Sequence, residues 1–222
     1  MFLDIYLKQK LGIIFFFVFV FTNINAQDSI QYTKDFRLYE GIYASYQEFR
    51  FNWPIDKDKI ITKIPKDQLD FFSKLTEYDV IEYKERDGSI VKIKSDKIWG
   101  YCQNNVVFIF QDNSFFRIPV FGAISNFIGT VEVTNYTNGY NPYTQAPITS
   151  TPYKTKEIRQ YMFDFYSGEI TQFSIEKLEE YLKRDPILYK EFMALNRKKK
   201  KSEAFKYLRL YNEKHPVYFP KG

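Results

Sequence analysis

The residue types that most often carry catalysis are scarce in this chain of 222 residues, which has one cysteine, Cys102, and one histidine, His215. These two cannot build a zinc site, which needs more ligands. His215 directly precedes Pro216 near the end of the chain, and the sequence specifies no adjacent nucleophile or orienting acid, so a triad enzyme is disfavoured. We expect Cys102, on an aromatic strand, to be a buried small hydrophobe. The sequence predicts no metal site and no cofactor.

Paired carboxylates offer a route to catalysis without histidine, because two of them suffice for glycoside hydrolysis. Asp164 and Glu169 face each other across a predicted hairpin, and Glu179 and Glu180 are adjacent on a predicted helix. Adjacent helical residues do not face one another, and any chain with 27 acidic residues contains such pairs by chance. We therefore interpret these acids as solvated charges. Whether the protein is an enzyme stays open, although the missing motifs favour a negative answer.

The most concentrated charge is a run of five basic residues near the C-terminus. The simplest interpretation is a solvated connection between the last two helices. The functional alternative is contact with an anionic envelope polymer or with lipid headgroups. Nucleic acid is not an expected partner, because the chain shows no nucleic-acid-binding motif. The run consists of Arg197, Lys198, Lys199, Lys200 and Lys201.

Residues 135–156 predict a long loop, because glycine, three prolines and many Thr and Asn residues fall within them. A loop of about 20 residues in a compact domain is either functional or disordered. Its tyrosines have two interpretations: they bind a partner protein or the flat face of a sugar, or the loop folds back and buries them against the sheet edge. These tyrosines are Tyr136, Tyr140, Tyr143 and Tyr153.

The elements that position these residues begin with a hairpin over residues 80–94. Gly88 in a three-residue loop sets a register in which Ile81 faces Ile93 and Glu82 faces Lys92. Residues 106–110 are apolar on both faces, as suits a central covered strand. Further strands are predicted at residues 39–44, 97–102, 115–120 and 129–134, and a last hairpin at residues 158–166 and 169–173.

Capping residues mark the helices. Ser45 and Glu48 form a capping box for a short early helix, and Asp67 is expected to cap a longer one over residues 67–78. Ser174 and Asp185 each begin a helix in the C-terminal part. A last helix is expected over residues 202–211, with Phe205 and Leu208 facing inward and Asn212 ending it.

Together these elements predict an α+β fold: a mostly antiparallel sheet built of hairpins, one helix inserted early, and a C-terminal cap of about three helices. Residues 27–173 would form the β-rich part, and residues 174–222 the helical cap packed on the same domain. Aromatic residues make up 20% of the chain, which supplies enough apolar surface to exclude an intrinsically disordered protein.

Residues 1–26 have the pattern of a secretory signal peptide. Two lysines precede an apolar run at residues 11–21, and a short polar stretch ends at Ala26. The run is too short to span a bilayer. We expect cleavage after Ala26, although retention as an anchor is an alternative. The mature protein would then lack a transmembrane segment and would be periplasmic or extracellular.

Three short motifs resemble segments of small, uncharacterised exported proteins from low-GC Gram-negative bacteria. The resemblance implies export and a shared α+β domain over most of the mature chain, and it implies no activity or site residue. The motifs are Gly41-Ile42-Tyr43 with Tyr46, Phe49, Asn52 and Pro54, then Trp99-Gly100-Tyr101-Cys102, and Tyr211-Asn212.

The function predicted from the sequence is that of an exported, non-enzymatic binding or structural domain of the bacterial cell envelope. Its partner would be an envelope protein or a polysaccharide, contacted through the tyrosines of residues 135–156 and by the basic run. The alternative is an envelope glycan or ester hydrolase that uses carboxylates.

Overall fold

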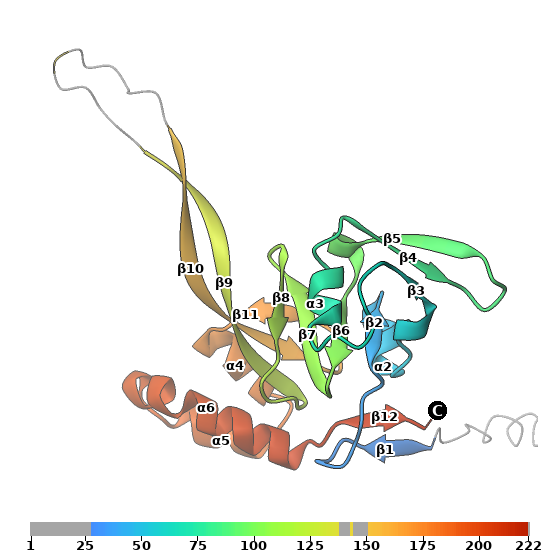
Figure 1. Ribbon diagram of the computed structural model, residues 1–222. Helices are drawn as coiled ribbons and strands as arrows, with labels where there is room; N and C mark the ends of the chain where they lie inside the picture. The colour runs from blue at the N-terminus through green and yellow to red at the C-terminus, as the bar shows by residue number, and fades with distance from the viewer. Residues whose placement is uncertain (1–27, 138–142, 144–150, 222) are drawn as a thin grey trace, which may run out of the picture.

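The computed structural model describes residues 28–137, 143 and 151–221, which form an α+β fold in which the paired strands are antiparallel (Figure 1). The predicted fold class is confirmed. The first and last strands, β1 (Ser29–Gln31) and β12 (Tyr218–Pro220), pair with each other. This pairing brings the two ends of the described chain together.

A four-stranded sheet lies at the centre of the fold. Its order is β2 (Gly41–Tyr43), β6 (Gly100–Gln103), β7 (Val106–Gln111) and β8 (Ser114–Arg117). Val107 and Ile109 of β7 belong to one hydrophobic cluster, and Phe108 packs against a second. The prediction that this strand is central and covered on both faces is therefore confirmed.

The hairpin of β4 (Val80–Lys84) and β5 (Ile90–Lys94) has the predicted register. Ile81 pairs with Ile93, and the Lys92 Nζ lies 2.6 Å from a carboxylate oxygen of Glu82. Gly88 has a φ of 86°, the left-handed conformation that the turn requires. The short strand β3 (Ile60–Ile61) pairs with β4 and completes a three-stranded sheet.

The longest strands form a second hairpin, where the predicted loop is partly wrong. β9 (Ile124–Tyr136) and β10 (Pro152–Asp164) pair along their whole length, so residues 135–136 and 152–156 are strand. The alternation of residues 129–134 predicts a strand, whereas the polar residues Lys154, Thr155 and Lys156 give no such pattern and resemble a loop. β11 (Ile170–Gln172) pairs with the far end of β10, which confirms the last predicted hairpin.

Of the two early helices, the first is short as predicted and the second is shorter than predicted. α2 (Tyr46–Arg50) has the predicted cap, in which the Ser45 hydroxyl accepts from the Glu48 N–H and the Glu48 carboxylate accepts from the Ala44 N–H. α3 is confined to Phe71–Leu75, with Asp70 as the N-cap residue, so the helix over 67–78 capped by Asp67 is wrong. Leu69 is 84% exposed because it precedes the helix and faces away from the core. Short 3-10 turns occupy Lys57–Lys59 and Ser95–Lys97.

The C-terminal helices are α4 (Ile175–Leu182), α5 (Pro186–Met193) and α6 (Arg197–Lys214). Ser174 and Asp185 cap the first two, as predicted. α6 is longer than predicted at both ends: Asn196 caps it, so the basic run forms its first turns and is no connection between helices. Phe205 is 47% exposed rather than inward, and Asn212 lies inside the helix.

Two hydrophobic clusters stabilise the fold. The larger joins buried side chains of the central sheet, the root of the β9–β10 hairpin and the C-terminal helices, including Phe127, Phe163 and Phe192. The smaller lies between α3, β4 and the other face of the central sheet, and includes Phe71, Phe72 and Ile81. Among the helices in the described residues, none combines the length and the apolar character that a membrane span needs.

Candidate binding surfaces

The β9–β10 hairpin consists of two parts that differ in burial. We call residues 124–131 and 157–164 its root, and residues 132–136 and 152–156 its arm. Root residues such as Phe127, Tyr161 and Phe163 are buried in the larger cluster. The arm continues the same antiparallel register from the Glu132–Lys156 pair to the Tyr136–Pro152 pair and extends away from the body of the molecule (Figure 1).

Three of the four tyrosines that the sequence singled out are described: Tyr136 and Tyr153 lie in the arm, and Tyr143 lies in the segment that joins its two strands. Tyr136 and Tyr153 are 61% and 49% exposed, and Tyr143 is 95% exposed. Tyr136 and Tyr153 lie on opposite faces of the ribbon, because Tyr153 pairs with Asn135. The alternative that they are buried against a sheet edge is therefore wrong for these three. Tyr140 lies outside the described residues.

Both edges of the arm lack a neighbouring strand among the described residues. β9 is the edge of its sheet, and β11 covers β10 only from Tyr161 to Phe163. Backbone N–H and C=O groups on such an edge are ready to pair with another strand. Charged residues on one face of the arm oppose indiscriminate pairing, and the Lys154 Nζ lies 2.5 Å from a carboxylate oxygen of Glu132.

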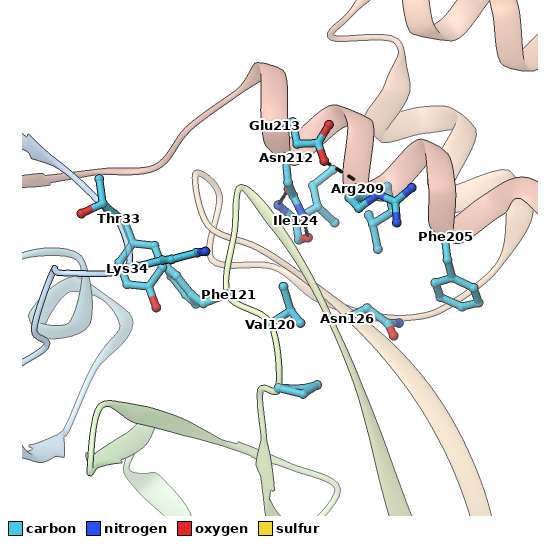
Figure 2. A pocket seen from close by; sticks show the side chains of 13 residues that line it. Thr33, Lys34, Val120, Phe121, Ile124, Asn126, Phe205, Arg209, Asn212 and Glu213 are labelled. Carbon is cyan, nitrogen blue, oxygen red and sulfur yellow. Dashed lines mark hydrogen bonds and ion pairs between the residues drawn. The ribbon is translucent and has the colours of Figure 1, made fainter.

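A cavity of about 800 Å³ lies beside the hairpin root. Figure 2 shows Thr33 and Lys34 of the N-terminal segment on one side, Phe205 and Arg209 of α6 on the other, and Val120 between them. Its lining residues come from segments separated by more than half of the chain. No local sequence pattern could have indicated it.

The side chain of Asn212 holds one wall of this cavity together. Its Oδ1 accepts from the Ile124 N–H at 2.8 Å, and its Nδ2 donates to the Ile124 carbonyl at 2.8 Å (Figure 2). Gly122 lies so close to the Asn212 amide that a Cβ there would meet it at 2.7 Å. Val120 is 69% exposed at the opening. The lining is mainly apolar, and Lys34 and an Arg209–Glu213 ion pair add charged groups to it.

The basic run occupies an electrostatically unfavourable place, since cations are disfavoured at a helix N-terminus. Lys200 is the member whose role within the fold is clear, because its Nζ lies 2.7 Å from a carboxylate oxygen of Glu179 and 5.6 Å from the Phe192 ring centroid. Arg197 and Lys201 line a shallow hollow beside Glu176. The exposed Arg197, Lys198 and Lys199 project from the first turn of α6.

Asp164 is not the solvated acid that the sequence suggested. Its side chain is fully buried at the end of β10 and accepts from the Arg184 guanidinium at 2.7 Å, the Ser167 hydroxyl at 2.7 Å and the Tyr166 N–H at 3.0 Å. Burial raises the pKa of Asp164, but these hydrogen bonds outweigh it and hold the pKa below its usual value. Glu169 pairs with it only through the backbone. The two acids therefore form no catalytic pair.

The remaining chemical candidates also have structural roles. His215 Nε2 lies 3.1 Å from a carboxylate oxygen of Asp185, which already caps α5. Cys102 is buried, as predicted, and burial raises its thiol pKa to about 12. Glu179 is held by Lys200, and Glu180 by Lys177 at 3.0 Å. In the residues that the structure describes, no three His, Cys, Asp or Glu side chains converge as a metal site.

Fold and surfaces together define an α+β domain with a projecting two-stranded arm (Figure 1). Compared with family models, with curated proteins and with solved structures, the chain gives no match.

Proposed function

We propose that this protein is an exported, non-enzymatic binding domain of the bacterial cell envelope that contacts a partner protein through its arm. The observation that carries the proposal is the exposure of Tyr136, Tyr143 and Tyr153 on and beyond a ribbon with two unpaired edges in the described residues. Tyrosine supplies a large contact area with a polar end and is enriched at protein interfaces.

The unsupported geometry of the arm favours this function. A two-stranded ribbon that leaves its core is marginally stable in water. A partner that adds a strand to either edge would satisfy the open backbone groups, and alternate side chains would give specificity. The cavity at the hairpin root would then seat an apolar side chain of the same partner.

Export is part of the proposal and depends on residues 1–26, which lie outside the described residues. The apolar run and the small residue at position 26 support it. Fractionation of the native cell and N-terminal sequencing of the isolated protein test it. We expect a periplasmic or extracellular protein that begins at Gln27, and a cytoplasmic protein that retains Met1 would contradict export.

The hydrolase alternative has weaker support. Catalysis by two carboxyl groups needs one that stays protonated near neutral pH. Burial raises the pKa of Glu48, but that carboxylate accepts from the Ala44 N–H at 2.6 Å and serves as part of a helix cap. Asp164 is held ionised by Arg184.

Site-directed photo-crosslinking in the native cell tests the arm. A photoreactive phenylalanine analogue replaces Tyr136 or Tyr153, and in the control it replaces Tyr78, which is also exposed (52%) but lies outside the arm. We expect the same discrete adduct from both arm positions and none from position 78. Absence of an arm-specific adduct in cells with normal protein levels would contradict the proposal.

The start of α6 is proposed as a second contact, with anionic envelope polymer or lipid headgroups. Basic residues at this helix end interact unfavourably with the helix dipole. An anionic ligand that neutralises them would therefore relieve this repulsion. Replacing Arg197, Lys198 and Lys199 by Gln should abolish sedimentation with vesicles that contain phosphatidylglycerol, whereas Lys154→Gln with Lys156→Gln and Lys190→Gln, the matched charge change, should retain it. Equal binding by both triple variants would refute this contact.

A further inference from the structure

Three aromatic side chains outside the arm form a second exposed surface, which we call the aromatic platform. Tyr39, Phe51 and Trp53 are 62%, 45% and 66% exposed, and the Phe51 and Trp53 ring centroids are 6.5 Å apart. They lie just before β2 and just after α2, a region that is well separated from the arm in Figure 1. Single exposed aromatics are ordinary, but a group of neighbours indicates a binding surface.

The backbone beneath the platform is held firmly. Asn52 is buried and has a φ of 51°, and its Oδ1 accepts from the Tyr39 N–H and from the Tyr43 hydroxyl, each at 2.9 Å. The Trp53 N–H donates to the Glu48 carbonyl at 2.8 Å, and Ile55 is bridged to Ile42. The exposed rings therefore project from a preorganised backbone, which lowers the entropy lost when a ligand binds.

Tyr39 and Trp53 stand between two hollows and line both of them. One hollow, of about 500 Å³, contains Glu40, Asp56, Lys57 and Asp58. The other, of about 410 Å³, contains Gln31, Asp35, Arg37 and Phe51. The platform thus separates two sets of hydrogen-bonding side chains.

We propose that the aromatic platform binds an oligosaccharide of pyranose sugars that carry no acidic group. A pyranose ring has an apolar face that stacks on an aromatic ring, while its hydroxyl groups need donors and acceptors at the ring's edge. The platform provides the aromatic rings for stacking, and the two hollows provide the hydrogen-bonding groups. Neighbouring sugars of one chain would lie in the two hollows, with a central sugar on Trp53 and Tyr39.

Charge selects the class of sugar. The two hollows together hold four carboxylates, from Asp35, Glu40, Asp56 and Asp58, against the two lining cations Arg37 and Lys57 and the nearby Lys66, whose Nζ lies 3.9 Å from Asp58. This excess disfavours uronic acids and other anionic sugars and suits neutral or amino sugars. An apolar protein surface would leave these polar groups buried without partners, which is unfavourable.

The two tryptophans of the chain give a direct test. Trp53 is exposed, whereas the Trp99 ring packs on Phe49 with centroids 4.3 Å apart, so iodide should quench mainly Trp53. Cellotetraose, N-acetylchitotetraose and tetragalacturonate are added to the full-length protein. We expect at least one of the two uncharged tetrasaccharides to protect the quenchable emission, and tetragalacturonate to leave it accessible.

Calorimetry on variants assigns the site. Trp53→Ala should weaken binding of the protecting tetrasaccharide by at least about tenfold. Leu69→Ala, which removes an 84% exposed apolar side chain outside the platform, should bind as the unmodified protein does. Tyr39→Ala is the second platform variant, and it decides the matter if Trp53→Ala does not fold.

Three results would overturn the proposal: no protection by either uncharged tetrasaccharide, unchanged affinity in a folded platform variant, or tighter binding of tetragalacturonate. The arm variants Tyr136→Ala and Tyr153→Ala should bind the sugar normally, because the proposed sugar site is separate from the arm. Failure of sugar binding would therefore leave the proposed function of the arm standing, and the reverse also holds.

Discussion

The root and the arm of the β9–β10 hairpin belong to the same two strands and share one hydrogen-bond register, yet they differ in what surrounds them. Root side chains such as Phe163 are fully buried, and the root acid Asp164 is held by Arg184. Arm side chains such as Tyr136 are largely exposed, and the arm acid Glu132 is paired on the surface with Lys154. Identical backbone pairing therefore occurs in two environments: the root packs in the hydrophobic core, and the arm is exposed to solvent.

The largest difference should appear between the two acids. Asp164→Ala should lower the free energy of unfolding by about 3 kcal/mol, because it leaves Arg184 without its partner and removes hydrogen bonds from a buried site. Glu132→Ala should change it by less than about 0.5 kcal/mol, as for other exposed pairs. Urea unfolding followed by circular dichroism measures both. Equal effects would show that root and arm do not differ in this way.

The lowered pKa of Asp164 gives a second way to distinguish this root acid from an exposed acid. Because its pKa is lowered in the fold, its contribution to stability is fully present above the ordinary carboxyl pKa of about 4 and is lost as pH falls through that value toward the lower folded pKa. Asp164→Asn should therefore be less stable than the unmodified protein at pH 7 and should lose less stability on acidification. Asp58→Asn, at a 92% exposed acid, is the control. Parallel pH profiles for Asp164→Asn and the unmodified protein would refute the assignment.

The amount that could be predicted from sequence also differs between two hairpins. The β4–β5 register was predictable, because a short glycine-containing turn and a clean alternation of polar and apolar residues fix it locally. The β9–β10 hairpin was predictable only where alternation was clear. Residues 152–156 are exposed or only partly buried, so burial imposed no apolar pattern on them, and proline and threonine resembled loop composition.

Features that depend on distant contacts could not be predicted. Asp164 reads as a surface acid until Arg184, from the segment after α4, is brought beside it. The basic run was interpreted as a solvated connection because a run of like charges is usually solvated. In the structure Asn196 caps a helix that begins with this run, and Lys200 contacts Glu179 on α4. The cavity in Figure 2 combines the N-terminal segment with α6, so its existence follows from topology alone. The helix caps at Ser45, Ser174 and Asp185 were predictable because capping is local.

Two asparagines extend the comparison to hydrogen bonds. Asn212→Ala should lower the free energy of unfolding by about 2 kcal/mol, because it removes both hydrogen bonds to the Ile124 backbone at the root. Asn135→Ala in the arm breaks a 2.6 Å side-chain hydrogen bond to Thr155, where water can replace the lost partner, and should lower it by about 0.5 kcal/mol. Thermal unfolding of the two variants measures the difference. A larger loss for Asn135→Ala would make the arm a stabilising element.

The smallest expected effect is the most informative for function. Replacing both Tyr136 and Tyr153 by Ala should change the free energy of unfolding by no more than about 0.5 kcal/mol, because the two exposed side chains lie on opposite faces of the ribbon. The same double variant should lose the photo-crosslinked adduct formed from a reporter at Lys154, which directly follows Tyr153 in the arm. A loss of stability above about 1 kcal/mol would mean that the tyrosines pack within the fold. An unchanged adduct would mean that the partner recognises the backbone of the arm rather than its rings.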